Sequence, residues 1–336
     1  MKPTIEIYGS TPHNYLLDHL SVSMEEGSHD LLTAYVVNPG VPRTDELKGA
    51  PAKITWGSGP NTTTSYGYVD TTAKITGDSF GWVIMVLGAT SVMRSGSARS
   101  FRRSTPFQIA STVTSPYRMA LAIDQYVSPL DNFMQTSGSD WAALKHLADQ
   151  TGMALVGSNT SIRLIDVRRA LGRAVSRPVP QLINPDSFVQ METPSPVGFD
   201  TYDFTGIDAL GNNFSVSGGP SGGVKRHSGR NFASLDDALN EGLQWEDRQR
   251  KFVRALATFS GQTPTKVGDI IAVEGARWFV SKCEHKVSGV SSTSDVSMEL
   301  HRVEKVRPAS LNNITPPDTR LMNGSWISSK RYEVEL

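Results

Sequence analysis

The closing block of the chain constrains the fold most, because it joins one long helical pattern to several strand patterns through a sharp turn. Apolar residues recur three or four positions apart from Ser234 to Phe259, a spacing that places side chains on one face of a helix. Ser234 is suited to cap the first turn, and a glycine and a proline after Phe259 are suited to end the helix. A Gly268-Asp269 turn and two strand-like runs follow, Trp278 to His285 and Asp295 to Arg302. No cluster of catalytic residue types lies in this block, which predicts a part that assembles with others.

Composition and charge set bounds on function. The 336 residues include 33 basic and 33 acidic side chains, so the formal net charge is zero. Such a chain has no global positive field to hold nucleic acid or an anionic membrane. The single cysteine, Cys283, lies in an alternating run, which favours a small buried side chain over a nucleophile.

Neither a secretory signal nor a membrane span is visible. The first residues lack a charged region followed by a long apolar stretch. The longest apolar run, Trp82 to Ala89, is far shorter than the roughly 20 residues that span a bilayer. We therefore expect a protein that is made in a cytoplasm and that stays soluble or assembles there.

Residues 1–104 have the pattern of a β domain. Apolar and polar residues alternate around Ile5 and from Leu20 to Met24, and polar turns separate these runs from others such as Gly81 to Leu87. Many short strands predict a sandwich or a small barrel.

Residues 105–166 have the pattern of a small α/β module. Thr105-Pro106-Phe107-Gln108 predicts a helix start, with a threonine cap and a proline at the first helical position. A second helix is expected from Ser115-Pro116 and a third from Ser139, with Gly152 just past its end. The second helix would carry Met119, Ala122 and Ile123, and two strands would follow the third, Ala154 to Val156 and Ile162 to Ile165.

Residues 167–306 are expected to form a second β domain that contains the long helix at about 234–259. Its first part, from Arg168 to Gly229, is rich in Pro, Gly, Ser and Asn, which suits long loops that face partners. Residues 307–336 are polar, and we interpret them as an extended arm that becomes ordered against another surface. The isolated apolar anchors of this arm are Leu321, Trp326 and Tyr332.

The motifs that carry chemistry in other proteins are weak here. The Gly219-Pro220-Ser221-Gly222-Gly223 run matches G-x-S-x-G, but the residues after it do not begin the helix that a nucleophile elbow requires. Gly57-Ser58-Gly59 lacks the third glycine of a dinucleotide fingerprint. The seven histidines form no H-x-x-x-H pattern, and His285 and His301 are expected to face each other across paired strands as a polar pair.

Charged clusters give two further candidates. Two sets of carboxylates could supply the acid pair of a glycosidase, but that chemistry requires a defined distance between the carboxyl groups, which a sequence does not give. Roles in a turn or at a helix start explain both sets equally well. A small basic cluster could contact phosphate or an acidic neighbour, although a solvated loop is the default. The carboxylate sets are Glu25, Glu26 and Asp30, or Asp236, Asp237 and Glu241, and the basic cluster is Arg94, Arg99, Arg102 and Arg103. We expect no catalytic residue, no cofactor and no metal site.

The order of these blocks resembles the tail or baseplate hub proteins of bacteriophages, the late control protein D group, whose hub fold also forms the base of type VI secretion spike proteins. The resemblance covers most of residues 1–306. Its motifs are Gly67-Tyr68-Val69, Thr105 to Ala110, Ser139 to Ala148, Gly268-Asp269 to Val273, and the strands that end at His285 and Arg302. The segment from Arg168 to Gly229 has no signature of the family. The tail after Pro308 is not a lysozyme, peptidase or needle-like spike domain.

The resemblance implies a mainly β structural protein with two tail-tube-like β-barrel domains, here residues 1–104 and 167–306, and the module 105–166 inserted on the outside. Three copies of such a chain would mimic a six-fold ring, and this homotrimer would join a six-fold tail tube to a three-fold tip. The implied partners are the tail tube or distal tail protein, a central spike or tip protein, the tape measure protein, and DNA that passes through the lumen without specific binding. The implied location is the phage tail of a virion assembled in the host cytoplasm.

Three alternatives stay open. A tail-associated cell-wall-degrading enzyme would need paired carboxylates about 5 to 9.5 Å apart in a cleft, or a zinc site. A receptor- or carbohydrate-binding tip module would expose aromatic side chains, for which Trp56, Tyr66, Tyr68 and Trp326 are the candidates. The hub of a secretion or contractile injection spike would continue into a repetitive β-needle.

Overall fold

The computed structural model divides into two compact units. The first unit comprises Met1–Thr193 with Arg254–Arg302, and the second comprises Pro194–Val253 with Val303–Leu336. The structure describes residues 2–9, 12–37, 47–57, 62–75, 81–124, 129–135, 138–167, 201–207, 213–218, 253–260, 264–273, 276–289 and 294–302, together with a few isolated positions and pairs.

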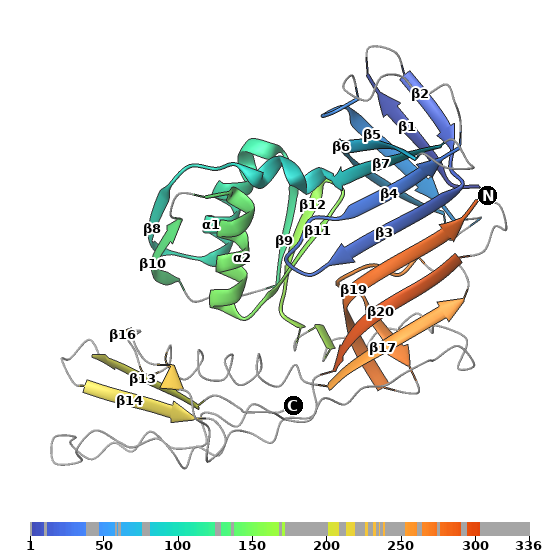
Figure 1. Cartoon of the computed structure of the whole chain (residues 1–336). Helices are drawn as coiled ribbons and strands as arrows, with labels where there is room; N and C mark the ends of the chain where they lie inside the picture. The colour runs from blue at the N-terminus through green and yellow to red at the C-terminus, as the bar shows by residue number, and fades with distance from the viewer. Residues whose placement is uncertain are drawn as a thin grey trace. The chain divides into compact units, whose positions relative to one another are not determined.

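An eleven-stranded sheet organises the first unit (Figure 1). Its strands follow the order β17-β20-β19-β3-β4-β7-β6-β5-β1-β2, and β18 pairs with β19 beside this path. The strands from the first part of the chain are β1 Thr4–Tyr8, β2 Pro12–Leu16, β3 His19–Glu25, β4 Leu31–Val36, β5 Pro51–Trp56, β6 Thr63–Ile75 and β7 Gly81–Gly88. Those from the last part are β17 Val253–Ser260, β18 Ile270–Val273, β19 Ala276–Ser288 and β20 Ser294–Arg302.

Strict alternation of side chains explains why these segments form strands. Ile5 and Ile7 of β1 are fully buried, and Glu6 between them is only half-buried. Leu20 and Val22 repeat this pattern in β3. One face of each strand therefore packs on the core while the other meets a more polar environment.

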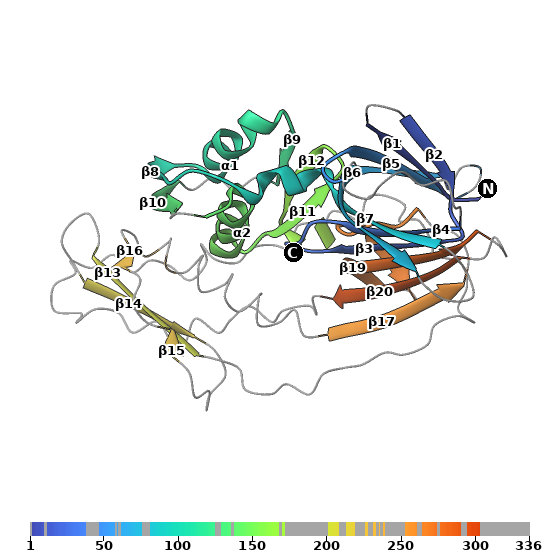
Figure 2. The ribbon, with the colours of Figure 1, turned by 45° about the horizontal axis from the view of Figure 1, so that its top comes forward.

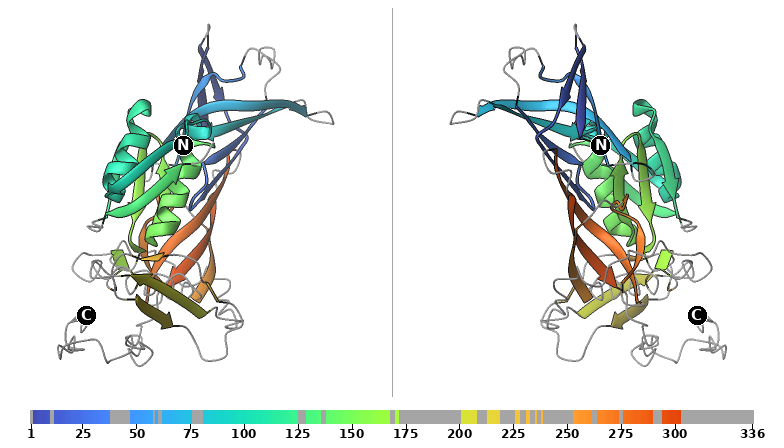
Figure 3. Two further views of the ribbon diagram at one scale, coloured as in Figure 1. Left: turned by 90° about the vertical axis from the view of Figure 1, so that its left-hand side faces the viewer. Right: turned by 90° about the vertical axis from the view of Figure 1, so that its right-hand side faces the viewer.

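A pairing between β3 and β19 joins segments that are far apart in the sequence. The two strands are antiparallel, with Val22 opposite His285 and Met24 opposite Cys283. Figure 3 shows the orange strands β17, β19 and β20 continuing the blue strands β3 and β4 as one twisted layer. Strands β17 to β20 of the second expected β domain thus join strands β1 to β7 of the first in one sheet. The domain boundaries at 104, 166 and 306 stay predictions.

The α/β module is built from two helices between a two-stranded ribbon and a three-stranded sheet (Figure 2). Its apolar core contains Phe133 of the ribbon, Ile109 and Leu144 of the two helices, and Leu164 of the sheet. The helices are α1 Pro106–Thr114 and α2 Asp140–Thr151; the ribbon is β8 Arg99–Ser104 with β10 Leu130–Gln135; the sheet is β9 Ala120–Ile123, β11 Ala154–Ser158 and β12 Ser161–Ile165. A 3-10 helix, η3 Ala89–Arg94, leads from β7 into the module.

Local capping signals fix the starts of both helices and the end of α2. The Thr105 side chain accepts a hydrogen bond from the Gln108 backbone N–H at 3.3 Å, and the Gln108 side chain accepts one from the Thr105 backbone N–H at 2.8 Å. Ser139 caps α2 in the same way at 3.0 Å, and Gly152 ends it at φ 68°, a conformation that favours glycine. The predicted starts of both helices are confirmed.

The helix expected from Ser115-Pro116 is wrong beyond its first turn. Ser115–Tyr117 form a single 3-10 turn, which ends at Arg118 with φ 53°. Residues Ala120–Ile123 then form β9, whose backbone pairs in parallel with β12. The pairing with a strand about 40 residues later outweighs the local helical spacing.

The helix expected over about 234–259 is wrong at its end, because Val253–Ser260 is the strand β17. In this strand Ala255 and Ala257 are buried while Leu256 is 45% exposed, so the burial has a period of two. The apolar residues of this stretch fit both periods, and pairing of β17 with β20 selects the strand. Leu235 and Ala238 are helical, and the rest of 234–252 lies outside the described residues.

The second unit contains a four-stranded sheet in the region expected to be rich in loops. β13 and β14 pair antiparallel, and β15 and β16 each pair in parallel with β13. The bounds are β13 Thr201–Ile207, β14 Asn213–Gly218, β15 Arg226–His227 and β16 Asn231–Phe232. The predicted fold class, mainly β with a small α/β module, is confirmed.

Candidate functional site

The β3–β4 turn connects the α/β module to the large sheet. The Gly27 N–H donates to the Leu155 carbonyl of β11 at 2.8 Å, and the Gly27 carbonyl accepts the indole N–H of Trp141 at 3.0 Å. Gly27 has φ 72°, a left-handed conformation that side chains disfavour, so glycine lets the turn present both groups to the module. Trp141 is buried on α2, and its one polar group is satisfied by this contact.

An imidazole packs on the indole at this junction. The His29 ring lies 4.6 Å from the Trp141 ring between centroids, and His29 Nδ1 is 2.9 Å from the Thr90 hydroxyl of η3. Burial, together with the smaller effect of the nearby positive charge of Arg94, lowers the pKa of His29 to about 4. His29 is therefore neutral near pH 7 and acts here as a packing and hydrogen-bonding group.

The turn between β11 and β12 docks on β6 of the large sheet, at residues that precede the pairing of β6 with β7. Asn159 has φ 50°, its side-chain amide donates to the Thr64 carbonyl at 3.1 Å, and its side-chain oxygen accepts the Tyr66 N–H at 3.0 Å. The amide therefore takes the place of a peptide group beside β6. Gly157 completes the contact, since a Cβ there would lie 2.7 Å from the Trp141 ring and 2.9 Å from the Thr90 methyl group.

A buried carboxylate ties the ribbon to α2. Asp140 accepts hydrogen bonds from Arg99 Nη1 at 2.9 Å, from Gln135 Nε2 at 2.6 Å and from the Tyr117 hydroxyl at 2.9 Å. The carboxylate also lies in the first turn of α2, where a negative charge favours the helix dipole. Four segments of the module thus share one charged centre.

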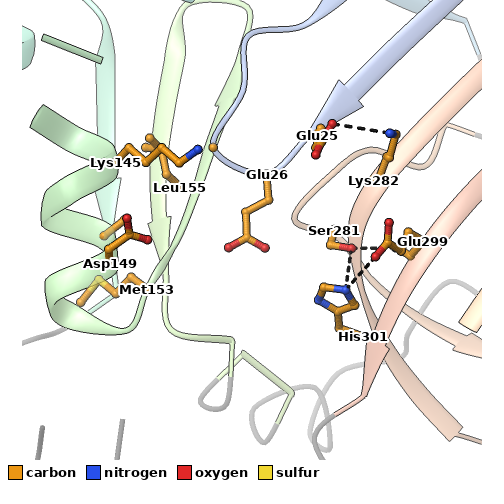
Figure 4. A pocket seen from close by; sticks show the side chains of 12 residues that line it. Glu25, Glu26, Lys145, Asp149, Met153, Leu155, Ser281, Lys282, Glu299 and His301 are labelled. Carbon is orange, nitrogen blue, oxygen red and sulfur yellow. Dashed lines mark hydrogen bonds and ion pairs between the residues drawn. The ribbon is translucent and has the colours of Figure 1, made fainter. Parts of the chain in front are cut away.

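A cavity of about 310 Å³ lies where the module, the β3–β4 turn and the strands β19 and β20 meet. Figure 4 shows Glu26 between α2 on one side and His301 on the other, and the contact between Glu25 and Lys282 at 3.5 Å. The charged and polar residues that line it are Glu25, Glu26, Lys145, Asp149, Ser281, Lys282, Glu299 and His301.

The cavity contains a serine, a histidine and a glutamate, but their geometry is not that of a catalytic triad. Ser281 Oγ lies 3.2 Å from His301 Nε2, and Glu299 Oε1 lies 3.3 Å from the same nitrogen. In a triad the serine and the carboxylate bind opposite ring nitrogens. Ser281 is only 4% exposed and its hydroxyl donates to the Glu299 carbonyl at 3.1 Å, so this cluster connects β19 to β20.

The first carboxylate set from the sequence is divided by the fold. Glu25 and Glu26 line the cavity, whereas Asp30 is 6% exposed and its carbonyl accepts the Gly88 N–H at 2.7 Å. Burial raises the pKa of Asp30 to about 7, although the positive charge of Lys266 opposes the rise. The second set, Asp236, Asp237 and Glu241, lies outside the described residues.

The expected histidine pair is wrong. Across β19 and β20, His285 lies opposite Val296, and His301 lies opposite Phe279. His285 Nε2 instead contacts the Thr265 carbonyl at 2.9 Å and the Cys283 sulfur at 3.2 Å. Burial raises the pKa of the Cys283 thiol to about 12, which makes the predicted structural role of this cysteine consistent with its chemistry.

The remaining candidates that the structure describes lie in the first unit. In the basic cluster Arg99 binds Asp140, Arg94 lies 3.6 Å from Asp70, and Arg102 and Arg103 are exposed. Among the aromatic residues Trp56 is buried and Tyr66 is 46% exposed. Gly57 and Gly59 have positive φ angles, as turns require, and the residues outside the described ranges include Gly219 to Gly223 and Trp326.

Sequence reasoning did not find the residues of the junction. Trp141 lies in the helix predicted from Ser139, and Asn159 lies between the two strands predicted after it, but the partners of both residues lie about 90 to 115 positions away. Within the described ranges, no group of three or more His, Cys, Asp or Glu side chains is placed to hold a metal ion. No helix there is long and apolar enough to cross a membrane.

Comparisons with known proteins identify the fold. The sequence matches no family model and no curated protein. A tail protein from Neisseria meningitidis superposes with a TM-score of 0.66 at 12% identity, over 90% of this chain and 97% of that protein. The 43 kDa tail protein of prophage MuSo2 from Shewanella oneidensis gives 0.64 at 14% identity, over 90% and 98%.

A third similar structure comes from a secretion machine. This Escherichia coli component of the type VI secretion system, described as structurally similar to the T4 tail proteins gp27 and gp5, gives a TM-score of 0.57 at 8% identity, over 91% of this chain and 79% of that one. The chain has the fold of phage tail proteins and of this related secretion component.

Proposed function

We propose that this chain is the structural hub of a phage tail tip or baseplate. Three copies would form a pseudo-hexameric ring that joins the six-fold tail tube to a three-fold tip. In this role the hub contacts the tail tube or distal tail protein on one side and a central spike or tip protein on the other. Its lumen gives passage to the tape measure protein and to DNA during genome ejection. The chain would act without catalysis, in the tail of a virion assembled in the host cytoplasm.

The observation that carries this proposal is the similarity of almost the whole chain to almost the whole length of two tail proteins. A match of this extent involves the large sheet and the module together rather than a single common motif. The secretion component described as similar to gp27 and gp5 supports the same architectural role.

The chemistry of the described residues also supports a mechanical role. Trp141 and Asn159 each bind a segment distant in sequence, and these two contacts hold the module on the large sheet. Asp140 joins the segments of the module to one another. A part that transmits force between a tube and a tip needs such a rigid connection. The zero net charge suits a conduit, because phosphate contacts would retard passing DNA.

The direct test is the mass and symmetry of the purified protein, by light scattering followed by electron-microscope class averages. We expect three-fold particles with an open channel and a pseudo-six-fold outline. If the chain forms trimers only on the tail, co-purification with its tube and tip proteins should give these particles. Monomers under both conditions would contradict the proposal.

The enzyme alternative has its own test, since Glu25 and Glu26 line a cavity. Purified cell wall is incubated with the protein and with the Glu26→Gln variant, and released sugars and peptides are measured. Hub function predicts no release by either protein. Release by the unmodified protein that Glu26→Gln abolishes would favour a wall-degrading enzyme.

A further inference from the structure

The β8–β10 ribbon has an open edge at the end of the module away from the large sheet (Figure 1). Its two strands pair only with each other among the described residues, with Phe101 opposite Phe133 and Arg102 opposite Asn132. An unpaired strand edge presents free backbone N–H and C=O groups that can pair with another strand.

The exposed side chains of this ribbon combine positive charge with apolar surface. Arg102 and Arg103 are exposed, and neither has an ion-pair partner in the described part of the chain. Met134 is 65% exposed, and Phe107 in the first turn of α1 is 56% exposed. Arg103 has φ 45°, a strained conformation for a side chain of this size, and such strain is commonly stored at functional positions. The surface therefore suits a partner strand that carries carboxylates and apolar side chains.

A segment of the chain itself has this chemistry. Residues 331–336 read Arg-Tyr-Glu-Val-Glu-Leu, with acidic and apolar residues in alternation, and they lie outside the described residues. As a strand, this segment would place Glu333 and Glu335 on one side and Tyr332, Val334 and Leu336 on the other. The 28 residues from Val303 to Lys330 span up to roughly 90 Å when extended, which is enough to reach a neighbouring molecule.

We propose that residues 331–336 of one copy add as a strand to the β8 edge of a neighbouring copy. Glu333 and Glu335 lie on the face of the ribbon that carries Arg102, while the apolar side of the strand covers the opposite face at Phe101, which is only partly buried at this edge. Arg103 follows near the end of β8, where its φ of 45° interrupts the alternation. This contact rests on the proposed trimer. It identifies the β8–β10 ribbon as the surface of each copy that the arm of a neighbouring copy binds. A protein strand is favoured over nucleic acid because the arginines stand among exposed apolar side chains.

Cross-linking between singly labelled copies tests the contact. The variants Ser100→Cys on β8 and Ser329→Cys on the arm are mixed, and a short bismaleimide is added. Cys283 is fully buried, so the unmodified protein serves as the unreactive control. We expect a covalent dimer in the mixture and not in either variant alone.

Charge reversal then tests the chemistry of the contact. Arg102→Glu with Arg103→Glu should lower the dimer yield about fivefold, and adding Glu333→Lys with Glu335→Lys to the partner copy should restore it. Arg118→Glu, an exposed arginine of the same module outside the ribbon, should leave the yield unchanged.

Several results would overturn the proposal. Trimers by light scattering without any cross-linked dimer would refute the arm contact and leave the hub function intact. Two other results would also refute it. One is cross-linking that occurs only when both cysteines are in one chain, and the other is a dimer yield that charge reversal does not change. Binding of labelled DNA that the two arginine reversals abolish would assign the ribbon to phosphate instead.

Discussion

At the scale of single residues, Asp140 is the charge on which the module depends most. The carboxylate is 1% exposed and accepts hydrogen bonds from three side chains, one of them the guanidinium of Arg99. In Asp140→Ala these donors lose their acceptor in a buried site, and removal of one partner of a buried ion pair costs about 3 to 5 kcal/mol. We expect a loss of about 3 kcal/mol in the free energy of unfolding, measured by urea denaturation, because Arg99 keeps some access to water.

The matched control is a surface ion pair of the same unit. Asp70 lies 3.6 Å from Arg94, and the two side chains are 42% and 56% exposed. Asp70→Ala should change the free energy of unfolding by less than about 1 kcal/mol. Equal effects of the two substitutions would contradict the assignment of Asp140 as the central charge of the module.

Asp30 makes a second prediction at this scale, because its pKa is raised to about 7 by burial. The folded protein holds this proton more tightly than the unfolded chain, where an aspartate titrates near 4. The contribution of Asp30 to stability is therefore greatest below pH 4, decreases as the pH rises from about 4 to 7, and is constant above. Asp30→Asn removes this titration, so the variant should gain about 1 to 3 kcal/mol relative to the unmodified protein between pH 4.5 and pH 8.

Thermal unfolding of the two proteins across this pH range measures the difference. His29 titrates in the same range with the opposite sign, since its lowered pKa makes the folded state less stable as the pH falls from about 6.5 to 4. Both proteins contain His29, so its contribution to the pH dependence of stability cancels when Asp30→Asn is compared with the unmodified protein. A stability difference that does not vary with pH would show that Asp30 does not titrate as described.

At the scale of elements, the turn between β11 and β12 acts as a connector. Asn159→Gly keeps the left-handed backbone, which has φ 50°, and removes both hydrogen bonds to β6. Net hydrogen-bond contributions of about 0.5 to 1.5 kcal/mol each predict a loss of about 1 to 3 kcal/mol in the free energy of unfolding. Hydrogen exchange should also become faster at the Tyr66 amide, while the amide of Ile7 in the core of the same sheet stays protected. Unchanged exchange at Tyr66 would contradict the connector role.

The same elements show which features a sequence can predict. The start of α1 follows from Thr105 and Gln108, and β3 follows from the alternation of Leu20 and Val22, because those signals lie within a few residues. β17 was predicted as helix because its apolar residues fit both periods, and only the pairing with β20 decides between them. The junction was not predictable, since Trp141 meets Gly27 through pairings that the local sequence does not encode.

At the scale of the whole molecule, the order of weak motifs predicted the fold better than any single motif did. The first carboxylate set illustrates why the sites were harder. Glu25, Glu26 and Asp30 are close in sequence, yet two line a cavity and one is buried beside Gly88. Which side chains share a site depends on the path of the turn between them. A fold that recurs in tail proteins at 12% to 14% identity must therefore be specified mainly by its pattern of strands and helices.

The arm after Val306 makes the last prediction at this scale. If its apolar residues anchor neighbouring copies, a chain that ends at Val306 should assemble at least tenfold more weakly, because the link between copies disappears. Analytical ultracentrifugation over a range of concentrations measures the assembly, and circular dichroism checks that the monomer stays folded. A second variant replaces only Trp326 and Tyr332 by serine in the full chain. It tests these two anchors directly and should reproduce much of the loss of assembly. Assembly that is unchanged in both variants would contradict a role of the arm between subunits, and would leave the described surfaces of the first unit as the source of any trimer.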